Sequence, residues 1–278
     1  IADESIYDLL VDRYFNGSGQ NDFNVNTQDP TQFAGGDIIG LVSKGENIAK
    51  LGYTIVSIGP VFSTEKYDGS MPTSYMELDP HFGTAEELIA AIDFFNSKKM
   101  KVMVDFPLSN VSANHEWAVN TDWIASTANG QIQFDLENPE VQAALKNALV
   151  EFISSYGFGG VRLTNIDGAS EPFLNELIAA IKDIDNTIYV MANGESNANF
   201  DVDFHEDTHM LFKDAFKDVD LSTEAVTKYV DSGDKPSQLF MDSIWTNRFT
   251  YDVMDTGNKY PPNRLPLAFA ATLLMPGV

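Results

Sequence analysis

The sequence predicts a (β/α)8 TIM barrel, an α/β fold in which parallel strands alternate with helices. Apolar, strand-like runs alternate with amphipathic helical stretches from one end of the chain to the other. Several of these runs are apolar at consecutive positions, as expected for parallel strands covered by helices on their faces. The chain has 278 residues, a length that one such barrel often fills. We therefore expect one domain over 1–278.

The strands are predicted from short apolar runs, most of them bounded by turn residues. "PGV" at the end of the sequence predicts the start of an eighth strand, with which the given chain ends. A short insertion is expected after the third strand, at about 108–138. The predicted strands are 6–15, 54–62, 101–108, 160–165, 187–195, 239–244 and the start of one at 276–278.

Helices are predicted where apolar residues recur at intervals of three and four, which places them on one face. The clearest case is 171–184, where Pro172 suits an early helical position and Gly157 suits the end of the preceding helix. Its apolar face comprises Phe173, Leu174, Leu177, Ile178 and Ile181. The other predicted helices are 85–99 and 140–156.

The composition excludes several classes of function. The formal net charge of −24 disfavours binding to nucleic acids and to anionic membranes. The absence of cysteine excludes disulfides and thiolate catalysis, and no apolar run reaches the roughly 20 residues of a membrane span. Acidity and a start at Ile1 rather than methionine suit a mature or trimmed extracellular or cell-surface protein. Acidic residues that only maintain solubility are the alternative explanation.

In such barrels the functional site lies at the C-terminal ends of the strands. Several of the predicted strands end in polar or charged residues there, and these are the candidates for chemistry. They include Tyr67, Asp105, Arg162, Glu195 and Asp242.

The strand ends resemble those of the α-amylase family of glycoside hydrolases, family 13. The similar segments follow one another in order along the whole chain, which makes the resemblance specific although each segment alone is weak. Its members hydrolyse or transfer α-glucosidic bonds with retention, using a nucleophilic carboxylate on strand four and an acid on strand five. The segments are "VDRYFNGSGQNDFNVNT", "YDGSMPTSYMELDPHFGT", "VMVDFPLSN", "QFDLENPEV", "GFGGVRLTN", "ANGES" and "FMDSIWTNRF".

The resemblance assigns roles residue by residue. Arg162 matches the arginine that orients the nucleophile, and Glu195 matches the general acid and base. Thr164, however, stands where the nucleophilic aspartate is expected. The resemblance further implies substrate-binding roles for Tyr67, Asp105, Asp242 and Arg248.

Two further motifs depart from the family pattern. Trp245 stands where a third catalytic aspartate is expected, and Ile244 replaces a histidine. In the third-strand motif, Ser109 and Asn110 replace an asparagine–histidine pair. Losses in several motifs favour a site that has degenerated naturally over a single inactivating substitution.

Two functions follow from these departures. A neutral threonine cannot replace a carboxylate that stabilises and then bonds to a cationic anomeric carbon, so we expect a catalytically inactive barrel. Such a pseudoenzyme would bind α-glucan or another protein, or serve as a structural domain in a carbohydrate-related process. The alternative is an active α-glucan hydrolase or transferase with a remodelled site, using Glu195 and a substitute carboxylate. The sequence does not predict the oligomeric state.

A loop near the start of the chain combines oxygen-bearing side chains with glycines. Oxygen donors of this kind suit Ca²⁺, and glycines permit the tight turns that such a loop needs. The family subgroup that includes neopullulanases carries calcium at this place, although Ser18 replaces a usual acid. The alternative is a polar turn without metal. The predicted ligands are Asn16, Ser18, Asn21, Asp22, Gly35 and Asp37.

Overall fold

The computed structural model describes most of the chain in two compact units. The larger, here called the barrel unit, comprises residues 6–193 and 197–200, and the second unit comprises the remaining residues. The described residues are 4–204, 235–240, 242–243, 246, 248–254, 265–266, 268–270 and 272.

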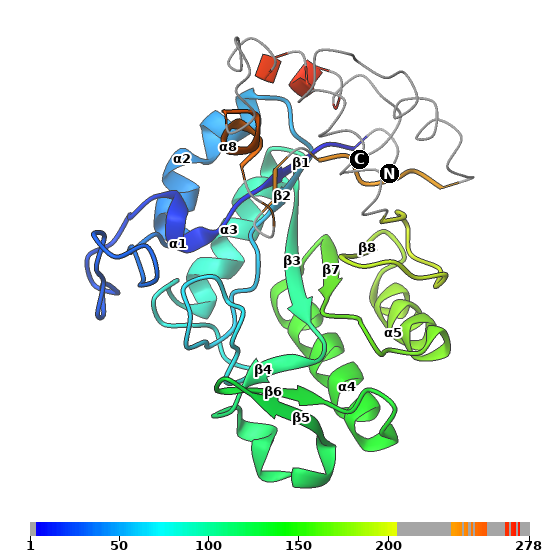
Figure 1. The fold of residues 1–278 in the computed structure, drawn as a ribbon. Coiled ribbons are helices and arrows are strands. Elements are labelled where there is room, and N and C mark those ends of the chain that lie inside the picture. The colour runs from blue at the N-terminus through cyan, green and yellow to red at the C-terminus, as the bar shows by residue number, and fades with distance from the viewer. Residues whose placement is uncertain are drawn as a thin grey trace. The chain divides into compact units, whose positions relative to one another are not determined.

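The barrel unit is built on a parallel five-stranded sheet in the order β1-β2-β3-β7-β8 (Figure 1). The ladder pairs each strand with its neighbour in register, and Asp105 on β3 lies opposite Arg162 on β7. The strands are β1 (Ile6–Asp8), β2 (Ile55–Ser57), β3 (Lys101–Pro107), β7 (Gly160–Thr164) and β8 (Tyr189–Ala192). Five of the predicted strands are thus confirmed in position.

The first predicted strand was too long. β1 ends at Asp8, and a short helix, α1 (Val11–Tyr14), follows within the region predicted as strand. The apolar residues of this run do not show where the strand stops, because Leu9 and Val11, beyond the end of β1, are buried as strand residues would be. The described residues of 239–244 belong to no strand, and 276–278 lies outside the described residues.

The three predicted helices are present as α3 (Ala85–Ser97), α4 (Pro139–Tyr156) and α5 (Glu171–Ile184). A polar side chain begins each of them: Thr84 forms a capping box, and Asn138 and Ser170 accept hydrogen bonds from the first turn. The buried face of α5 consists of the five predicted apolar residues. α4 ends at Gly157, whose φ of +77° is left-handed as predicted for a helix end.

A further helix, α2 (Ile38–Lys50), was not predicted because two glycines interrupt its pattern. Both glycines permit close packing. A Cβ atom at Gly40 would lie 1.8 Å from the carbonyl oxygen of Phe15, and one at Gly45 would lie 2.3 Å from the Phe94 ring. The helix therefore sits closer to its neighbours than a side chain would allow, and α2 packs against α3, α3 against α4, and α4 against α5.

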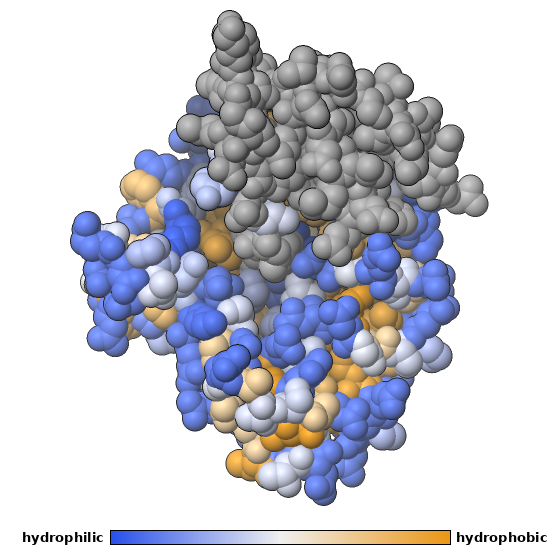
Figure 2. Space-filling model, in the orientation of Figure 1, coloured by the Kyte–Doolittle hydropathy of each residue, from blue (hydrophilic) through white to orange (hydrophobic). Residues whose placement is uncertain are grey.

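The insertion after β3 folds as a small antiparallel sheet in the order β4-β6-β5. Its strands are β4 (Asn110–Ser112), β5 (Ile124–Ala128) and β6 (Gln131–Phe134), with 3₁₀ turns at Glu116–Val119 and Thr121–Trp123. In Figure 2 hydrophobic surface gathers in the lower part of the view, where Figure 1 places this sheet. The predicted insertion at about 108–138 is confirmed.

The barrel unit has a continuous aromatic and aliphatic core. Tyr75 stacks on Phe106 with ring centroids 4.8 Å apart, and Phe62 meets Phe106 edge to face at 5.4 Å. Edge-to-face and stacked pairs add to the stabilisation that burial alone provides. The described part of the second unit includes the helix α8 (Phe249–Met254). No helix among the described residues has the length and apolar character of a membrane span.

Candidate functional site

Arg162 is the centre of a buried ion cluster in the barrel unit. It lies in the middle of β7, is 4% exposed, and points to the same face as Thr164 two residues on. Its Nε donates to Oδ1 of Asp105 at 2.8 Å, and NH2 donates to Oδ2 of the same carboxylate at 3.0 Å. This bidentate pair fixes the plane of the guanidinium group.

The same guanidinium reaches two further strands. NH2 of Arg162 also donates to Oδ1 of Asp8 on β1 at 3.1 Å and to the hydroxyl of Ser57 on β2 at 3.3 Å. β1 lies three strand spacings from β7 in the sheet order, or about 14 Å in a flat sheet. The contact therefore requires the sheet to curve inward, as it does in a barrel.

The carboxylate of Asp105 and the guanidinium of Arg162 change each other's pKa. Burial raises the pKa of Asp105 to about 6, against the lowering by Arg162, and the carboxylate of Asp8 raises it further. Burial would lower the pKa of Arg162, but Asp105 and Asp8 hold it above its ordinary value. Arg162 is therefore a permanent cation, and Asp105 is the partner whose raised pKa brings its charge change toward neutral pH.

Thr164 ends β7 opposite Pro107 at the end of β3, and it is buried. Its carbonyl oxygen accepts a hydrogen bond from the Leu108 backbone at 2.9 Å. The next residue, Asn165, has a left-handed φ of +53°, and its carbonyl accepts a hydrogen bond from the Ser109 hydroxyl at 2.9 Å. Ser109 thus ties the end of β3 to the turn that follows Thr164.

Tyr67 lies in the loop after β2, half-buried, with the guanidinium carbon of Arg13 3.8 Å from its ring centroid. Arg13 also donates to the carbonyl oxygens of Pro30 and Gln32 at 2.7 and 2.8 Å. One face of the Tyr67 ring is therefore covered, and the ring is held next to the loop that follows β1.

The other residues of the predicted catalytic and sugar-binding motifs belong to the second unit or lie outside the described residues. Glu195 is exposed. Asp242 accepts a hydrogen bond from the Phe249 backbone and lies 3.8 Å from NH1 of Arg248, so these two predicted binding residues do come together. Trp245 and Ile244 lie outside the described residues.

In the predicted calcium loop, the two buried carboxylates accept amide hydrogen bonds. Asp37 accepts from the backbones of Gly17, Ser18 and Gly40, at 3.1, 2.8 and 2.6 Å, and so caps α2. Asp12 accepts from the backbones of Ala34 and Gly35 at 2.9 and 3.3 Å. Burial raises the pKa of Asp12, against those two amides and Arg13. Both carboxylates therefore hold the backbone of the loop by accepting its amide hydrogen bonds.

Three of the predicted ligands lie together. The amide nitrogen of Asn16 is 2.8 and 3.0 Å from the two oxygens of Asp22, and a Cβ atom at Gly35 would be 2.7 Å from each side chain. Asn21 donates to the carbonyl oxygen of His81, and its own Oδ1 is buried without a partner. A buried oxygen acceptor without a partner, on the residue that precedes Asp22, fits a cation, whereas the oxygens of Asp37 already accept backbone hydrogen bonds.

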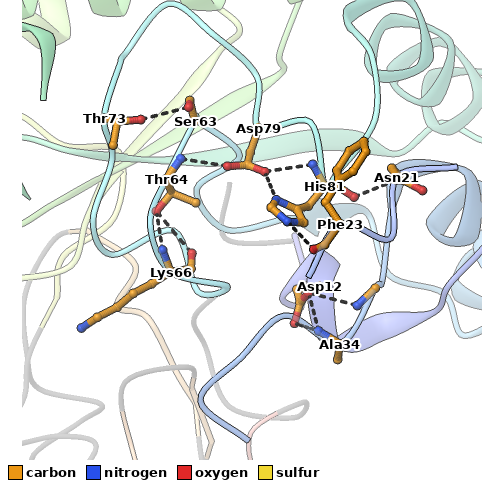
Figure 3. Close-up of polar contacts among 11 residues, drawn as sticks. Asp12, Asn21, Phe23, Ala34, Ser63, Thr64, Lys66, Thr73, Asp79 and His81 are labelled. Atoms are coloured by element: carbon orange, nitrogen blue, oxygen red, sulfur yellow. Dashed lines mark hydrogen bonds and ion pairs between the residues drawn. The ribbon is translucent and has the colours of Figure 1, made fainter. Parts of the chain in front are cut away.

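A histidine joins this loop to the loop after β2 (Figure 3). Nδ1 of His81 lies 2.6 Å from Oδ1 of Asp79, and Nε2 lies 2.9 Å from the carbonyl oxygen of Phe23. The ring of Phe33 stacks on the imidazole at 3.8 Å. No group of three or more His, Asp or Glu side chains with the geometry of a metal site occurs among the described residues.

Asp8 and His81 are among the residues of these clusters that were missed from the sequence. Asp8 is the last residue of β1, so the strand-end rule that selected the other candidates would have selected it. The predicted strand ran on to residue 15 and hid that position. His81 had no such signal, because its partner Phe23 comes from a segment 58 residues away in the chain.

The comparisons with known proteins agree with this arrangement. A family model for the alpha-amylase catalytic domain matches residues 8–129. A beta/alpha-amylase of Paenibacillus polymyxa is 25% identical over 69% of the chain, and a cyclomaltodextrinase of a Bacillus species is 25% identical over 69%. These alignments cover only 18% and 40% of the two relatives, so the chain spans less than half of either.

Solved structures match the fold over the full length of the chain. The alpha-amylase of Geobacillus thermoleovorans, solved with acarbose, superposes with a TM-score of 0.89 at 25% identity over all of this chain and 69% of its own. An Anoxybacillus alpha-amylase gives a TM-score of 0.90 at 23% identity with the same coverage. The fold is therefore the (β/α)8 barrel of these amylases, and the chain is similar to alpha-amylase catalytic domains over the residues that the family model matches.

Proposed function

We propose that this amylase-type barrel binds α-glucan without hydrolysing it by the family's retaining mechanism. The observation that carries the proposal is the end of β7, where Arg162 is retained but Thr164 stands in place of a carboxylate. A retaining mechanism needs two carboxyl groups about 5 Å apart, one as nucleophile and one as acid. A threonine hydroxyl can neither balance an oxocarbenium charge nor leave as a carboxylate does.

The polar groups of the site suit binding better than turnover. Asp105 and Asp8 are both engaged by Arg162, so neither is a free nucleophile. Tyr67 presents an aromatic ring that Arg13 supports from one face, and sugars stack on such rings. The names of the relatives, amylases and a cyclomaltodextrinase, point to an α-glucan as the ligand, with a protein partner as the other candidate.

Isothermal titration with maltooligosaccharides tests the binding part of the proposal. We expect heat of binding at millimolar sugar, a large loss in Tyr67→Ala, and a small one in Tyr67→Phe, which keeps the ring. Absence of heat would remove the glucan and leave a protein-binding or structural role. A remodelled hydrolase, the second candidate, would reveal itself by consuming the oligosaccharide during the titration, and product analysis of the recovered sample measures this.

We also propose that the loop 16–37 binds Ca²⁺ through Asp22, the carbonyl oxygen of Gly35 and the buried Oδ1 of Asn21. Hard oxygen donors of this kind are the ligands that calcium prefers. Calcium would then raise the melting temperature of the protein, and less so in Asp22→Asn. Asp29→Asn is the matched control, because Asp29 lies in the same loop but bonds only to Thr31 and Gln32. No calcium bound at millimolar concentration, by metal analysis, would contradict the proposal.

An extracellular or cell-surface location remains part of the proposal and rests on the acidic composition alone. Detection of the protein in the culture medium and on intact cells of its source, against a cytoplasmic marker, tests it. Confinement to the cell interior would contradict it.

A further inference from the structure

The retained arginine poses a problem of charge. A buried guanidinium group must be paired, because an uncompensated charge in the interior is strongly destabilising. In the family pattern the arginine orients a carboxylate at the position of Thr164, and that carboxylate is absent here. Yet Arg162 is 4% exposed and remains an intact cation.

Two carboxylates of the barrel unit, those of Asp105 and Asp8, pair with this guanidinium. Asp105 occupies Nε and one hydrogen of NH2. Asp8 accepts from NH2 at 3.1 Å, on the side of the guanidinium that faces β1. The side chain of Asp8 is 23% exposed whereas that of Asp105 is fully buried, so Asp8 lies at the open edge of the cluster.

The register shows how a residue on β1 reaches the arginine. Asp8 pairs with Ser57, which also contacts NH2, and Ser57 pairs with Met103, two residues before Asp105. Arg162 thus bridges four adjacent strands through contacts at or near the ends of β1 and β2. The guanidinium already has two carboxylate partners, so a third carboxylate at position 164 would add an uncompensated negative charge.

We propose that Asp8 has taken over from the missing strand-four carboxylate as the anionic partner of Arg162. It is a positioning residue: it fixes the arginine toward β1 and makes a carboxylate at position 164 both unnecessary and unfavourable. The negative charge that pairs with Arg162 therefore lies on β1, at Asp8, instead of at position 164. Restoring an aspartate at position 164 alone would not rebuild the family arrangement, because Asp8 would still hold the arginine.

A charge-relocation cycle tests this directly. Urea unfolding at pH 7 is compared for the parent chain, Asp8→Asn, Thr164→Asp and the double variant D8N/T164D. We expect each single change to raise the unfolding equilibrium constant about tenfold or more, and the double variant to be at least tenfold more stable than the product of the singles predicts. Single effects that multiply to within twofold would overturn the proposal.

Thr164→Asn is the matched control, since it has the size of aspartate without the charge. In the Thr164→Asn background, Asp8→Asn should not restore stability beyond the product of the two single effects. A restoration as large as that in the Thr164→Asp background would assign the coupling to packing and overturn the proposal. If Thr164→Asp does not fold alone, the double variant must fold, as judged by circular dichroism; two unfolded proteins would also overturn it. The inference rests on the proposed function. Unfolding measurements do not report sugar binding or hydrolysis, so the inference about Asp8 and the proposed function can each fail without the other.

Discussion

His115 makes the barrel unit sensitive to acid, and this follows from its surroundings in the insertion. The residue is 2% exposed, its Nδ1 accepts a hydrogen bond from the Trp117 backbone at 3.1 Å, and its Nε2 is buried without a partner. The rings of Tyr75, Trp117 and Phe134 surround it, with centroids 4.9, 5.2 and 5.4 Å away. Burial lowers the pKa of His115 from 6.5 to about 4.

The sign of the effect follows from proton binding in the two states. Between pH 6.5 and 4 the unfolded chain binds a proton at His115 and the folded protein does not, so acid favours unfolding. The stability is fully present above pH 6.5 and is lost as the pH falls toward 4. One pKa unit is worth about 1.4 kcal/mol, so the loss attributable to His115 is about 3 kcal/mol over this window.

His115→Asn isolates this contribution, because the asparagine oxygen can still accept the Trp117 hydrogen bond but does not titrate. Free energies of unfolding in urea are measured for both proteins from pH 7.5 to pH 4. The difference between them should change by about 3 kcal/mol across the window, with the parent losing more. The raised pKa of Asp105 makes its contribution to the free energy of unfolding change in the opposite direction with pH. That contribution is the same in both proteins and cancels in the difference. Parallel pH profiles would refute the reasoning.

Three further changes probe the packing and the ion cluster, each by urea unfolding. Arg162→Met should cost about 3–5 kcal/mol at pH 7, because it leaves the buried Asp105 unpaired, and a cost below 1 kcal/mol would contradict the cluster. Gly35→Ala should cost more than about 1 kcal/mol, since φ is +87° and a Cβ would meet Asn16 and Asp22, whereas Gly130→Ala, also at positive φ but open, should cost less. Leu177→Ala, fully buried in α5, should cost about 2–5 kcal/mol, against about 0.5 kcal/mol or less for the exposed Ile184→Ala.

Elements whose signals lie within their own segment of sequence were predicted well. The helix α5 was predicted with its bounds and its buried face, because an amphipathic repeat and its capping residues are local signals. The insertion was predicted as an interval but not as a three-stranded sheet, because β5 has one half-buried and four exposed residues and lacks a strand's alternation. The helix α2 was missed because its glycines serve contacts with Phe15 and Phe94 that only the fold creates.

The candidate site was predictable in its residues but not in its pairing. Arg162 and Asp105 came from the motifs, and the register of β3 and β7 brings them together. Within the barrel unit the carboxylate partners of Arg162 are Asp105 and Asp8, and the contact with Asp8 was not predicted. Which strands meet across the curved sheet depends on all of its strands together, so no single segment of sequence predicts it.

The central proposal is that this amylase-like barrel does not carry out retaining hydrolysis, and reducing-sugar release from maltooligosaccharides tests it most directly. The chain and its Glu195→Gln variant are incubated with maltoheptaose at high enzyme concentration, and products are followed for many hours against a buffer blank. We predict that both match the blank. Release of reducing sugar by the parent chain that disappears in Glu195→Gln would contradict the account and assign catalysis to a remodelled site.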